Sequence, residues 1–381
     1  MKIIKKPDPI LLAASLTLVL LGVLILASVS AVFSMEKTGQ PNYLLNHQLL
    51  YGLLPGLILG LMAFFFPLEK LKNISFWLFV LNLFFLGLLV SSRIGLNLMG
   101  ASRWISLGPI TFQPSEFLKI SLILYLAAWL TKQEVVSRAN GKSRFFAQLN
   151  PLLPFLLILG VVTLLLALQP DIGTLAIIAL MATVMFFLSG APWWQNISIW
   201  VSGATIFAFL IKIAPYRLNR WLVFLNPDLD PMGRGYQLKQ SLIAIGSGGF
   251  FGLGLGLSRQ KFGFLPQTIG DAIFSVWAEE AGFFGAAILI LVFLIFIWQG
   301  FRVSRLSKDK FSQLIGAGIS FWIGFQALAN IFSMTGLSPL TGVPLPFVSY
   351  GGSHLTAELI GIGLLLNISK ETLASLEPRA R

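Results

Sequence analysis

The segment 236–285 holds the residues of this chain that could do acid–base chemistry. A glycine-rich run is followed there by Arg259 and Lys261, and then by Asp271, which stands among apolar residues with no basic neighbour in the sequence. Burial should raise the pKa of such a carboxyl group, and a nearby cation should lower it. A carboxylate in this setting is a candidate general base.

Other ionisable residues lie at the ends of apolar segments. Glu116 and Lys119 are three positions apart and so share one face of a helix. Ionisable groups at membrane depth are costly and therefore indicate functional sites by default. Further charges expected at the same membrane face are Arg103, Asp171, Glu279 and Glu280.

Each of these residues also has a purely structural interpretation. Glu116 follows a proline at a helix start, where an acid complements the helix dipole. Its pairing with Lys119 is explained equally well by a structural ion pair and by a ligand site. Asp171 fits a helix N-cap, and at least one of Glu279 and Glu280 fits a capping or dipole role at the start of its helix. The sequence alone leaves both interpretations open.

Several patterns resemble functional motifs but have simpler explanations. The two aspartates within 228–230 lie in NPDLDP, where Asn/Asp–Pro turn chemistry accounts for them without a metal. The glycine run lacks the Gly-Lys-Ser/Thr of a phosphate loop and is better explained by close backbone packing. His47 and His354 are isolated and the chain has no cysteine, so the spacing predicts no metal site and no disulfide.

The composition is typical of a membrane protein. Of the 381 residues, 56% are hydrophobic and 11% are charged, against about 25% charged residues in soluble domains. The apolar runs are continuous rather than alternating, which predicts membrane helices and not strands. The net charge of +12 is better explained by loop lysines and arginines facing an anionic leaflet than by nucleic acid, so no nucleic-acid partner is expected.

About ten apolar segments are long enough, or nearly so, to cross the roughly 30 Å of membrane hydrocarbon. They lie near residues 10–33, 46–66, 74–91, 115–131, 151–168, 172–189, 196–214, 281–300, 313–332 and 355–368. Basic residues concentrate in alternate connections, which places both termini in the cytoplasm. We therefore expect an all-α polytopic membrane protein, a single domain over 1–381, whose connection at about 215–280 is a large outer loop with short or re-entrant helices.

Five motifs resemble those of one family, the SEDS proteins (shape, elongation, division and sporulation), which are polytopic peptidoglycan glycosyltransferases. In chain order they are GASRWISLGPITFQPSEFLK, QPDIGT, GYQLKQSLIAIGSGGFFGLGLGLSRQKFGFLP, DAIFSVWAEEAGF and PLPFVSYGGS. They extend from the third predicted span to the last. The SRQKF and PLPFVSYGGS segments are more similar to the division branch, FtsW, than to the elongation branch, RodA.

The resemblance implies an activity and a set of site residues. The reaction would be polymerisation of lipid II, a disaccharide-pentapeptide on undecaprenyl diphosphate, at the outer face of the cytoplasmic membrane during cell division. Asp271 would be the catalytic residue, removing a proton from the acceptor sugar's 4-hydroxyl. The substrate-binding residues would be Arg103, Glu116, Lys119, Gln237, Arg259, Lys261 and Ser349.

The resemblance also implies partners and leaves two alternatives. The partners would be a membrane-anchored class B penicillin-binding transpeptidase and other membrane proteins of division or elongation. No cofactor is required by the motifs, although Mg²⁺ or Mn²⁺ could accompany the diphosphate. The alternatives are a lipid II flippase or transporter, and a non-catalytic division scaffold. Charges clustered at one membrane face, away from the midplane, favour the enzyme over the transporter.

The sequence departs from the family pattern at two places. Before Asp271 the chain reads LPQTIG, so Gln267 stands where the family has a glutamate, and the usual histidine is missing. After GGS, His354 replaces a second serine. These replacements leave the roles of Gln267 and His354 open and concentrate the expected chemistry on Asp271.

Overall fold

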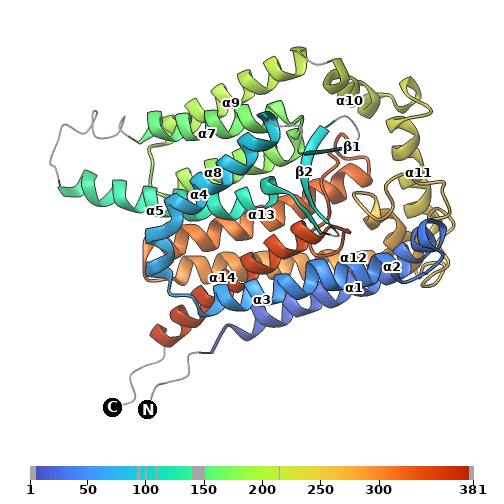
Figure 1. Cartoon of the computed structure of the whole chain (residues 1–381), viewed down its shortest axis with the longest axis horizontal. Coiled ribbons are helices and arrows are strands. Elements are labelled where there is room, and N and C mark those ends of the chain that lie inside the picture. Colours follow the sequence, from blue (N-terminus) through green and yellow to red (C-terminus); the bar gives the residue numbers. More distant parts are fainter. Residues whose placement is uncertain are drawn as a thin grey trace.

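The computed structural model describes residues 6–91, 95–98, 101–108, 110–139, 151–213 and 215–376. Long helices run side by side in alternating directions (Figure 1). The start of helix α1 (Pro9–Thr38) and the end of α14 (Gly352–Leu376) lie at one end of the bundle. The short helices α10 (Pro215–Leu225) and α11 (Arg234–Ser247) lie at the other end.

Each predicted apolar segment falls on a helix. Beyond α1 and α14, these helices are α2 (Tyr43–Gln48), which continues through a π-helical turn (Leu49–Leu53) into α3 (Leu54–Phe65), then α4 (Leu68–Ser91), α5 (Pro114–Ala139), α7 (Leu152–Leu168), α8 (Ile172–Leu188), α9 (Trp193–Ile213), α12 (Ile273–Leu306) and α13 (Lys310–Met334). In the described chain, five stretches are long and apolar enough to cross a membrane: α1, α2 to α3, α4, α12 and α13. The polytopic helical class is confirmed, while the count of ten spans stays a prediction.

Helix α13 is the centre of the bundle. In its most apolar stretch of 18 residues, 78% is buried inside the protein, whereas the corresponding share is 39% or less for the other four candidate spans. It contacts α5, α8, α12 and α14, and Figure 1 shows it between them. A polar side chain on α13 therefore meets protein rather than lipid, and must find its hydrogen bonds there.

A small antiparallel sheet, which the sequence did not predict, is added to the helical bundle. Strands β1 (Gly95–Leu98), β2 (Ala101–Leu107) and β3 (Ile110–Phe112) pair in that order just before α5. β-branched and aromatic residues favour strands, and Gly108 provides the turn between β2 and β3 with a φ of +73°. The sheet brings Arg103 to the end of the bundle where α5 begins.

The long connection before α12 contains short helices, as the sequence predicts. After α10 come a 3₁₀ turn (Pro227–Leu229), α11 and a glycine-rich stretch without regular structure. Glycine is required where this stretch packs on α12. A Cβ atom at Gly248 would lie 2.1 Å from the carbonyl oxygen of Ala278, and one at Gly252 would lie 2.1 Å from that of Glu280. The expected close backbone packing is confirmed, and it fixes the connection against the start of α12.

Candidate active site

Asp271 lies in the turn immediately before α12, at the end of the bundle that carries α10 and α11. Its side chain is partly buried, and its two oxygens lie 3.4 and 3.5 Å from the amide nitrogen of Gln237, on α11. Burial raises the pKa of the Asp271 carboxyl to about 6, against the opposing effects of its hydrogen bonds and of the positive charge of Arg220. At neutral pH the group is therefore an ionised carboxylate, and a stronger base than an ordinary aspartate.

The loop between α13 and α14 holds the backbone at Asp271. The hydroxyl of Ser349 donates to the carbonyl oxygen of Gly270 at 2.6 Å. The backbone N–H of Tyr350 donates to the carbonyl oxygen of Ile269 at 2.9 Å. From α13, the amide of Asn330 donates to the backbone carbonyl of Asp271 at 2.7 Å. Three hydrogen bonds on successive residues thus set the position from which the carboxylate projects.

Ser349, predicted to bind substrate, is a buried member of this support. Its hydroxyl also accepts a 2.8 Å hydrogen bond from the backbone N–H of Leu345. We expect Ser349→Ala to lower the free energy of unfolding by about 1–3 kcal/mol, because it leaves both backbone groups without a partner. Thermal unfolding in detergent measures this loss. An unchanged melting temperature together with weaker lipid II binding would instead assign the hydroxyl to the substrate.

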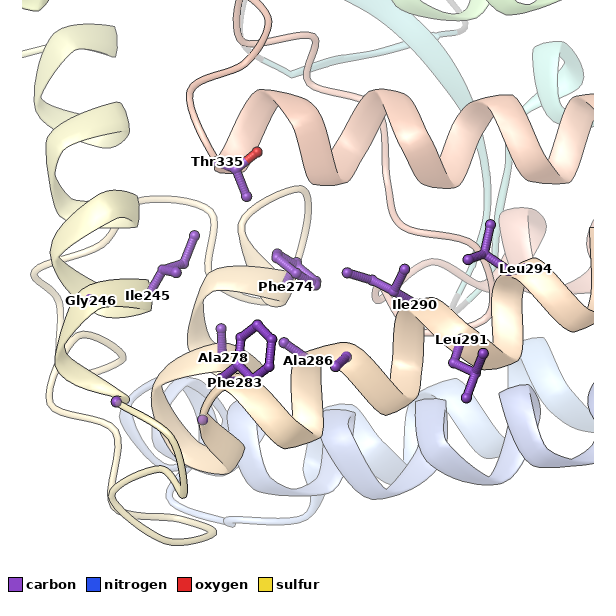
Figure 2. A pocket seen from close by; sticks show the side chains of 13 residues that line it. Ile245, Gly246, Phe274, Ala278, Phe283, Ala286, Ile290, Leu291, Leu294 and Thr335 are labelled. Atoms are coloured by element: carbon purple, nitrogen blue, oxygen red, sulfur yellow. The ribbon is translucent and has the colours of Figure 1, made fainter.

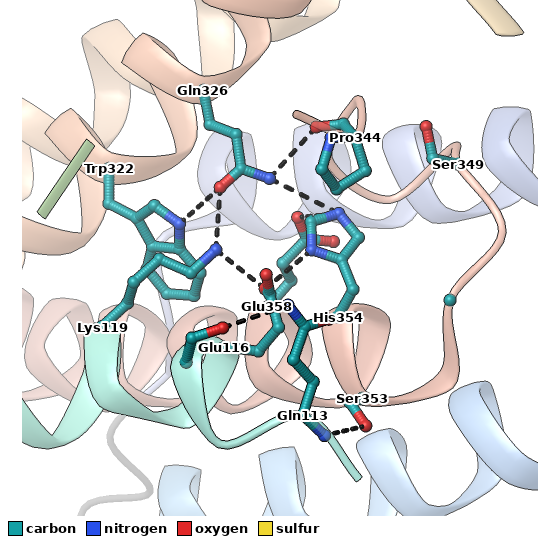
Figure 3. Close-up of polar contacts among 12 residues, drawn as sticks. Gln113, Glu116, Lys119, Trp322, Gln326, Pro344, Ser349, Ser353, His354 and Glu358 are labelled. Carbon is teal, nitrogen blue, oxygen red and sulfur yellow. Dashed lines mark hydrogen bonds and ion pairs between the residues drawn. The ribbon is translucent and has the colours of Figure 1, made fainter. Parts of the chain in front are cut away.

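The predicted pair Glu116 and Lys119 lies in a buried polar cluster (Figure 3). The ammonium of Lys119 is 2.8 Å from Glu116 Oε2 and donates to Gln326 Oε1 on α13 at 2.9 Å. Glu116 is 3% exposed and Lys119 is 1% exposed. His354 Nδ1, on α14, lies 2.9 Å from the same Glu116 oxygen, and Glu358 lies one turn further along that helix. The ion-pair interpretation is confirmed, and substrate binding by this pair stays a prediction.

Glu358 and Gln326 were not selected from the sequence, and His354 was noted there only as a departure from the family pattern whose role was left open. Glu358 is an isolated acid inside the last apolar segment, which is the signal that could have found it. Gln326 carries no such signal, and the replacement at His354 does not indicate its contacts, because a lone polar residue in a helix does not reveal which other helix it meets.

Lys261 and Arg259 occupy different environments. Lys261 is buried, with its ammonium 2.8 Å from Glu280 Oε1, whereas the side chain of Arg259 is exposed. The backbone N–H of Arg259 donates to Glu279 Oε1 at 3.0 Å. The two glutamates therefore anchor the glycine-rich stretch. The expectation that one of them caps a helix is wrong. The first turn of α12, which begins at Ile273, contains no acid, and where Gly282 interrupts this helix the next two backbone N–H groups donate to carbonyls of the glycine-rich stretch. A dipole role at this interruption stays a prediction.

Arg103 joins the sheet to the turn between α7 and α8. Its guanidinium donates to the carbonyls of Gln169, at 3.1 Å, and of Pro170, and it lies 3.9 Å from Asp171 Oδ1. Asp171 is the N-cap of α8 and accepts from the backbone N–H of Thr174 at 3.5 Å. The capping interpretation of Asp171 is confirmed, and Arg103 reinforces it.

All the predicted site residues except the exposed Arg259 thus fall into four groups. Asp271 lies with Gln237 and Ser349, Glu116 with Lys119, Lys261 with Glu280, and Arg103 with Asp171. Sequence reasoning missed Arg220, on α10, whose charge acts on Asp271 and whose guanidinium donates to the carbonyl of Thr341 at 3.3 Å. Its position on a strongly amphipathic short helix was the available signal.

An apolar cavity of about 710 Å³ lies beside α12 (Figure 2). Its lining comes from α11, the glycine-rich stretch after it, α12 and the residue after α13, and includes Ile245, Phe274, Phe283, Leu294 and Thr335. None of the predicted site residues lines it, but Phe274 is only three positions after Asp271. A cavity lined by apolar side chains is suited to binding a hydrocarbon chain. Among the residues that the structure describes, no three His, Asp or Glu side chains are grouped so that they could hold a metal ion.

Comparisons with known proteins identify the family. The chain matches the FtsW/RodA/SpoVE family, described as cell cycle proteins, over residues 9–374, and it therefore belongs to this family of helical membrane proteins. It is 36% identical over 378 residues to stage V sporulation protein E of Bacillus subtilis, covering 96% of this chain and 98% of that one. It is 37% identical to the probable peptidoglycan glycosyltransferase FtsW of Coxiella burnetii, covering 96% of each chain.

Solved structures agree with this assignment. A chain from a peptidoglycan synthase complex, described as coordinating polymerization and crosslinking, superposes with a TM-score of 0.76 at 28% identity, covering 96% of this chain and 98% of that one. The rod shape determining protein RodA of Thermus thermophilus superposes with a TM-score of 0.68 at 27% identity, covering 95% and 96%. The fold is therefore shared with both of these proteins along almost the whole chain.

Proposed function

We propose that this protein is a peptidoglycan glycosyltransferase that polymerises lipid II into glycan strands during cell division. The observation that carries the proposal is Asp271, a carboxylate whose pKa burial raises to about 6 and whose backbone is held by α13 and the loop before α14. Family membership and the names of the FtsW and SpoVE relatives support this activity and its role in division.

In the proposed reaction, the acceptor sugar's 4-hydroxyl oxygen attacks the anomeric carbon of the lipid-linked donor. The bond from that carbon to the diphosphate oxygen breaks, and the lipid diphosphate leaves with the bonding electrons. Asp271 accepts the hydroxyl proton as the new glycosidic bond forms. The protein's second task is to stabilise the negative charge on the departing diphosphate.

Four basic residues among the predicted substrate-binding residues could stabilise the diphosphate: Arg103, Lys119, Arg259 and Lys261. They differ in their availability to an anion. Arg259 is exposed and can meet an anion directly. Lys119 and Lys261 are buried against Glu116 and Glu280, so binding an anion would require them to leave those carboxylates. Arg259 is therefore the first of these residues to test as a phosphate ligand, and Mg²⁺ or Mn²⁺ would enter with the diphosphate rather than bind in a cage of protein ligands.

We place the Asp271 end of the bundle at the outer face of the cytoplasmic membrane, with both termini in the cytoplasm. The excess of lysine and arginine in the connections at the opposite end supports this orientation. The outer catalytic segment would then be the connection at about 215–280, within a single domain over 1–381. The apolar cavity beside Phe274 would accommodate part of the undecaprenyl chain.

Reconstitution with lipid II tests the proposal and separates it from the alternatives. We expect the purified full-length chain, with a class B penicillin-binding transpeptidase as partner, to form glycan polymer in detergent, where no membrane sidedness exists. The similarity to a chain of a peptidoglycan synthase complex supports such a partner. Translocation of lipid II across vesicles without polymer would show a flippase. Normal growth of cells with an inactive Asp271 variant would show a scaffold.

The pH dependence of polymerisation should report the protonation of Asp271. A base with a pKa of about 6 is protonated at lower pH, so kcat/KM should fall about tenfold per pH unit below 6 and level off above it. Rates measured with lipid II from pH 4.5 to 8.5 provide the profile. A profile that stays flat down to pH 4.5 would contradict the assignment.

Gln237→Leu provides a matched check on this profile. The Gln237 amide favours the ionised carboxylate and so lowers the pKa of Asp271. Its removal should move the acidic limb, which is the fall of kcat/KM at low pH, to higher pH. The reason is that a smaller fraction of the carboxyl group is then ionised at a given pH.

A further inference from the structure

His354 and Glu358 connect the charged cluster of α5 to the last helix. His354 Nδ1 lies 2.9 Å from Glu116 Oε2, and its Nε2 lies 2.9 Å from Glu358 Oε1 (Figure 3). His354 is 4% exposed and Glu358 is fully buried. The carboxylates of Glu116 and Glu358 face two basic side chains, His354 and Lys119. With both basic groups charged, the buried cluster has no net charge. Each member would be costly to bury alone.

The same cluster holds the loop between α13 and α14. The second oxygen of Glu358 accepts a 2.7 Å hydrogen bond from the backbone N–H of Phe347. Phe347 has a φ of +64°, a left-handed conformation that a bulky residue adopts only when its surroundings impose it. Gln326 donates to the carbonyl of Pro344 at 3.1 Å and also contacts Lys119. The cluster therefore fixes two points within four residues of this loop.

The loop in turn reaches Asp271. Two residues beyond Phe347, Ser349 donates to the carbonyl of Gly270, and the next residue, Tyr350, donates from its backbone to Ile269. A continuous path of hydrogen bonds and short backbone segments thus leads from His354 and Glu358 to the turn that carries Asp271.

We propose that His354 and Glu358 are positioning residues for Asp271, acting through the Phe347 turn. Neither side chain needs to touch substrate. A serine at position 354, which the family pattern predicts, is too short to bridge Glu116 and Glu358, so the two residues act as a pair in this chain. The proposal rests on the proposed function, because the effect of misplacing Asp271 is measured as polymerisation.

Replacing Glu358 tests this inference. Glu358→Leu removes the acceptor for Phe347, and we expect kcat for lipid II polymerisation to fall about 10²-fold, the typical effect of misplacing a catalytic group by about 1 Å. The KM for lipid II should change little, because the substrate contacts remain. The acidic limb of the pH profile should also move, since the surroundings of Asp271 change. Glu358→Gln, whose amide oxygen can still accept from Phe347, should recover most of kcat.

Asn367→Leu is the matched control on the same helix. Asn367 is buried and donates to the carbonyls of Ala63 and Phe66, far along α14 from the loop. Loss of the Asn367 amide should lower the melting temperature but leave kcat and the acidic limb of the pH profile unchanged. His354→Ser should resemble Glu358→Leu, because it removes the bridge to Glu116.

The outcomes separate this inference from the proposed function. If the wild-type chain polymerises lipid II and Glu358→Leu does so with the same kcat and pH profile, only the positioning role is overturned. If the wild-type chain with its partner makes no polymer, the proposed function itself fails. Should Glu358→Leu not fold, Glu358→Asp decides, because it keeps the charge but withdraws the oxygen from Phe347. Wild-type kcat in that variant overturns the inference.

Discussion

Asp271→Asn is expected to leave a folded, membrane-inserted protein that polymerises lipid II about 10²–10⁴-fold more slowly than the wild type. Asparagine has nearly the same size and shape. The backbone contact of residue 271 with Asn330 and those of the loop with Ile269 and Gly270 are unaffected. It cannot accept the acceptor sugar's proton. Gel-resolved glycan products, quantified over time for both proteins, measure the loss.

The stability of Asp271→Asn should be equal to or higher than that of the wild type. The folded-state pKa of about 6 lies above the ordinary value of 3.8, so the folded protein favours the protonated form. The resulting stabilisation is complete below pH 3.8 and is lost as pH rises through about 6. At pH 8 the ionised carboxylate destabilises the fold, and the neutral amide does not. Thermal unfolding at pH 8 therefore distinguishes a lost base from a damaged fold.

Asp228→Asn is the control for this comparison. Asp228 belongs to the same long connection, but its side chain is 77% exposed and pairs with Lys239 at the surface. Its replacement should leave polymerisation near the wild-type rate. Wild-type polymer formation by purified Asp271→Asn would remove Asp271 from the mechanism, whatever the result at Asp228.

The helices were predictable because hydropathy is a local property. A helix that meets lipid or a packed core must be apolar along its own length, so each predicted segment coincides with a helix. The close packing of the glycine run was predictable for a similar reason, since glycines crowded in a short stretch indicate that another backbone approaches. Asp271 was predictable because an acid among apolar residues needs a local explanation.

The contacts between distant segments were not predictable. Burial requires each charge to have a partner, but the sequence does not say which one. Glu116 meets His354, which is 238 positions away, and Ser349 meets Gly270, 79 positions away. The sheet around Arg103 was missed because its short strands lie between apolar helices. Glu279 and Glu280 were interpreted as helix-start residues because the apolar run begins next to them, where the non-helical Gly282 interrupts α12, whereas the helix as a whole begins at Ile273.

Lys119→Met is expected to lower the free energy of unfolding by about 3–5 kcal/mol, the typical cost of breaking a buried ion pair from one side. The ammonium of Lys119 contacts Glu116 and Gln326 and lies 4.8 Å from the centre of the Trp322 ring. Methionine fills similar space but leaves Glu116 with a buried charge that, among the described residues in contact with it, His354 alone can balance. Thermal unfolding in detergent measures the loss.

The double variant Glu116→Gln with Lys119→Met shows whether the loss comes from charge. It removes one charge of each sign and leaves His354 facing Glu358, so the cluster stays balanced and much of the stability should return. Lys239→Met, which breaks a surface pair with Asp228, should cost only about 0–1 kcal/mol. If Lys119→Met costs no more than Lys239→Met, the buried cluster is not what holds α5 to α13 and α14. Stability lost equally in the single and double variants would instead assign the effect to packing against Trp322.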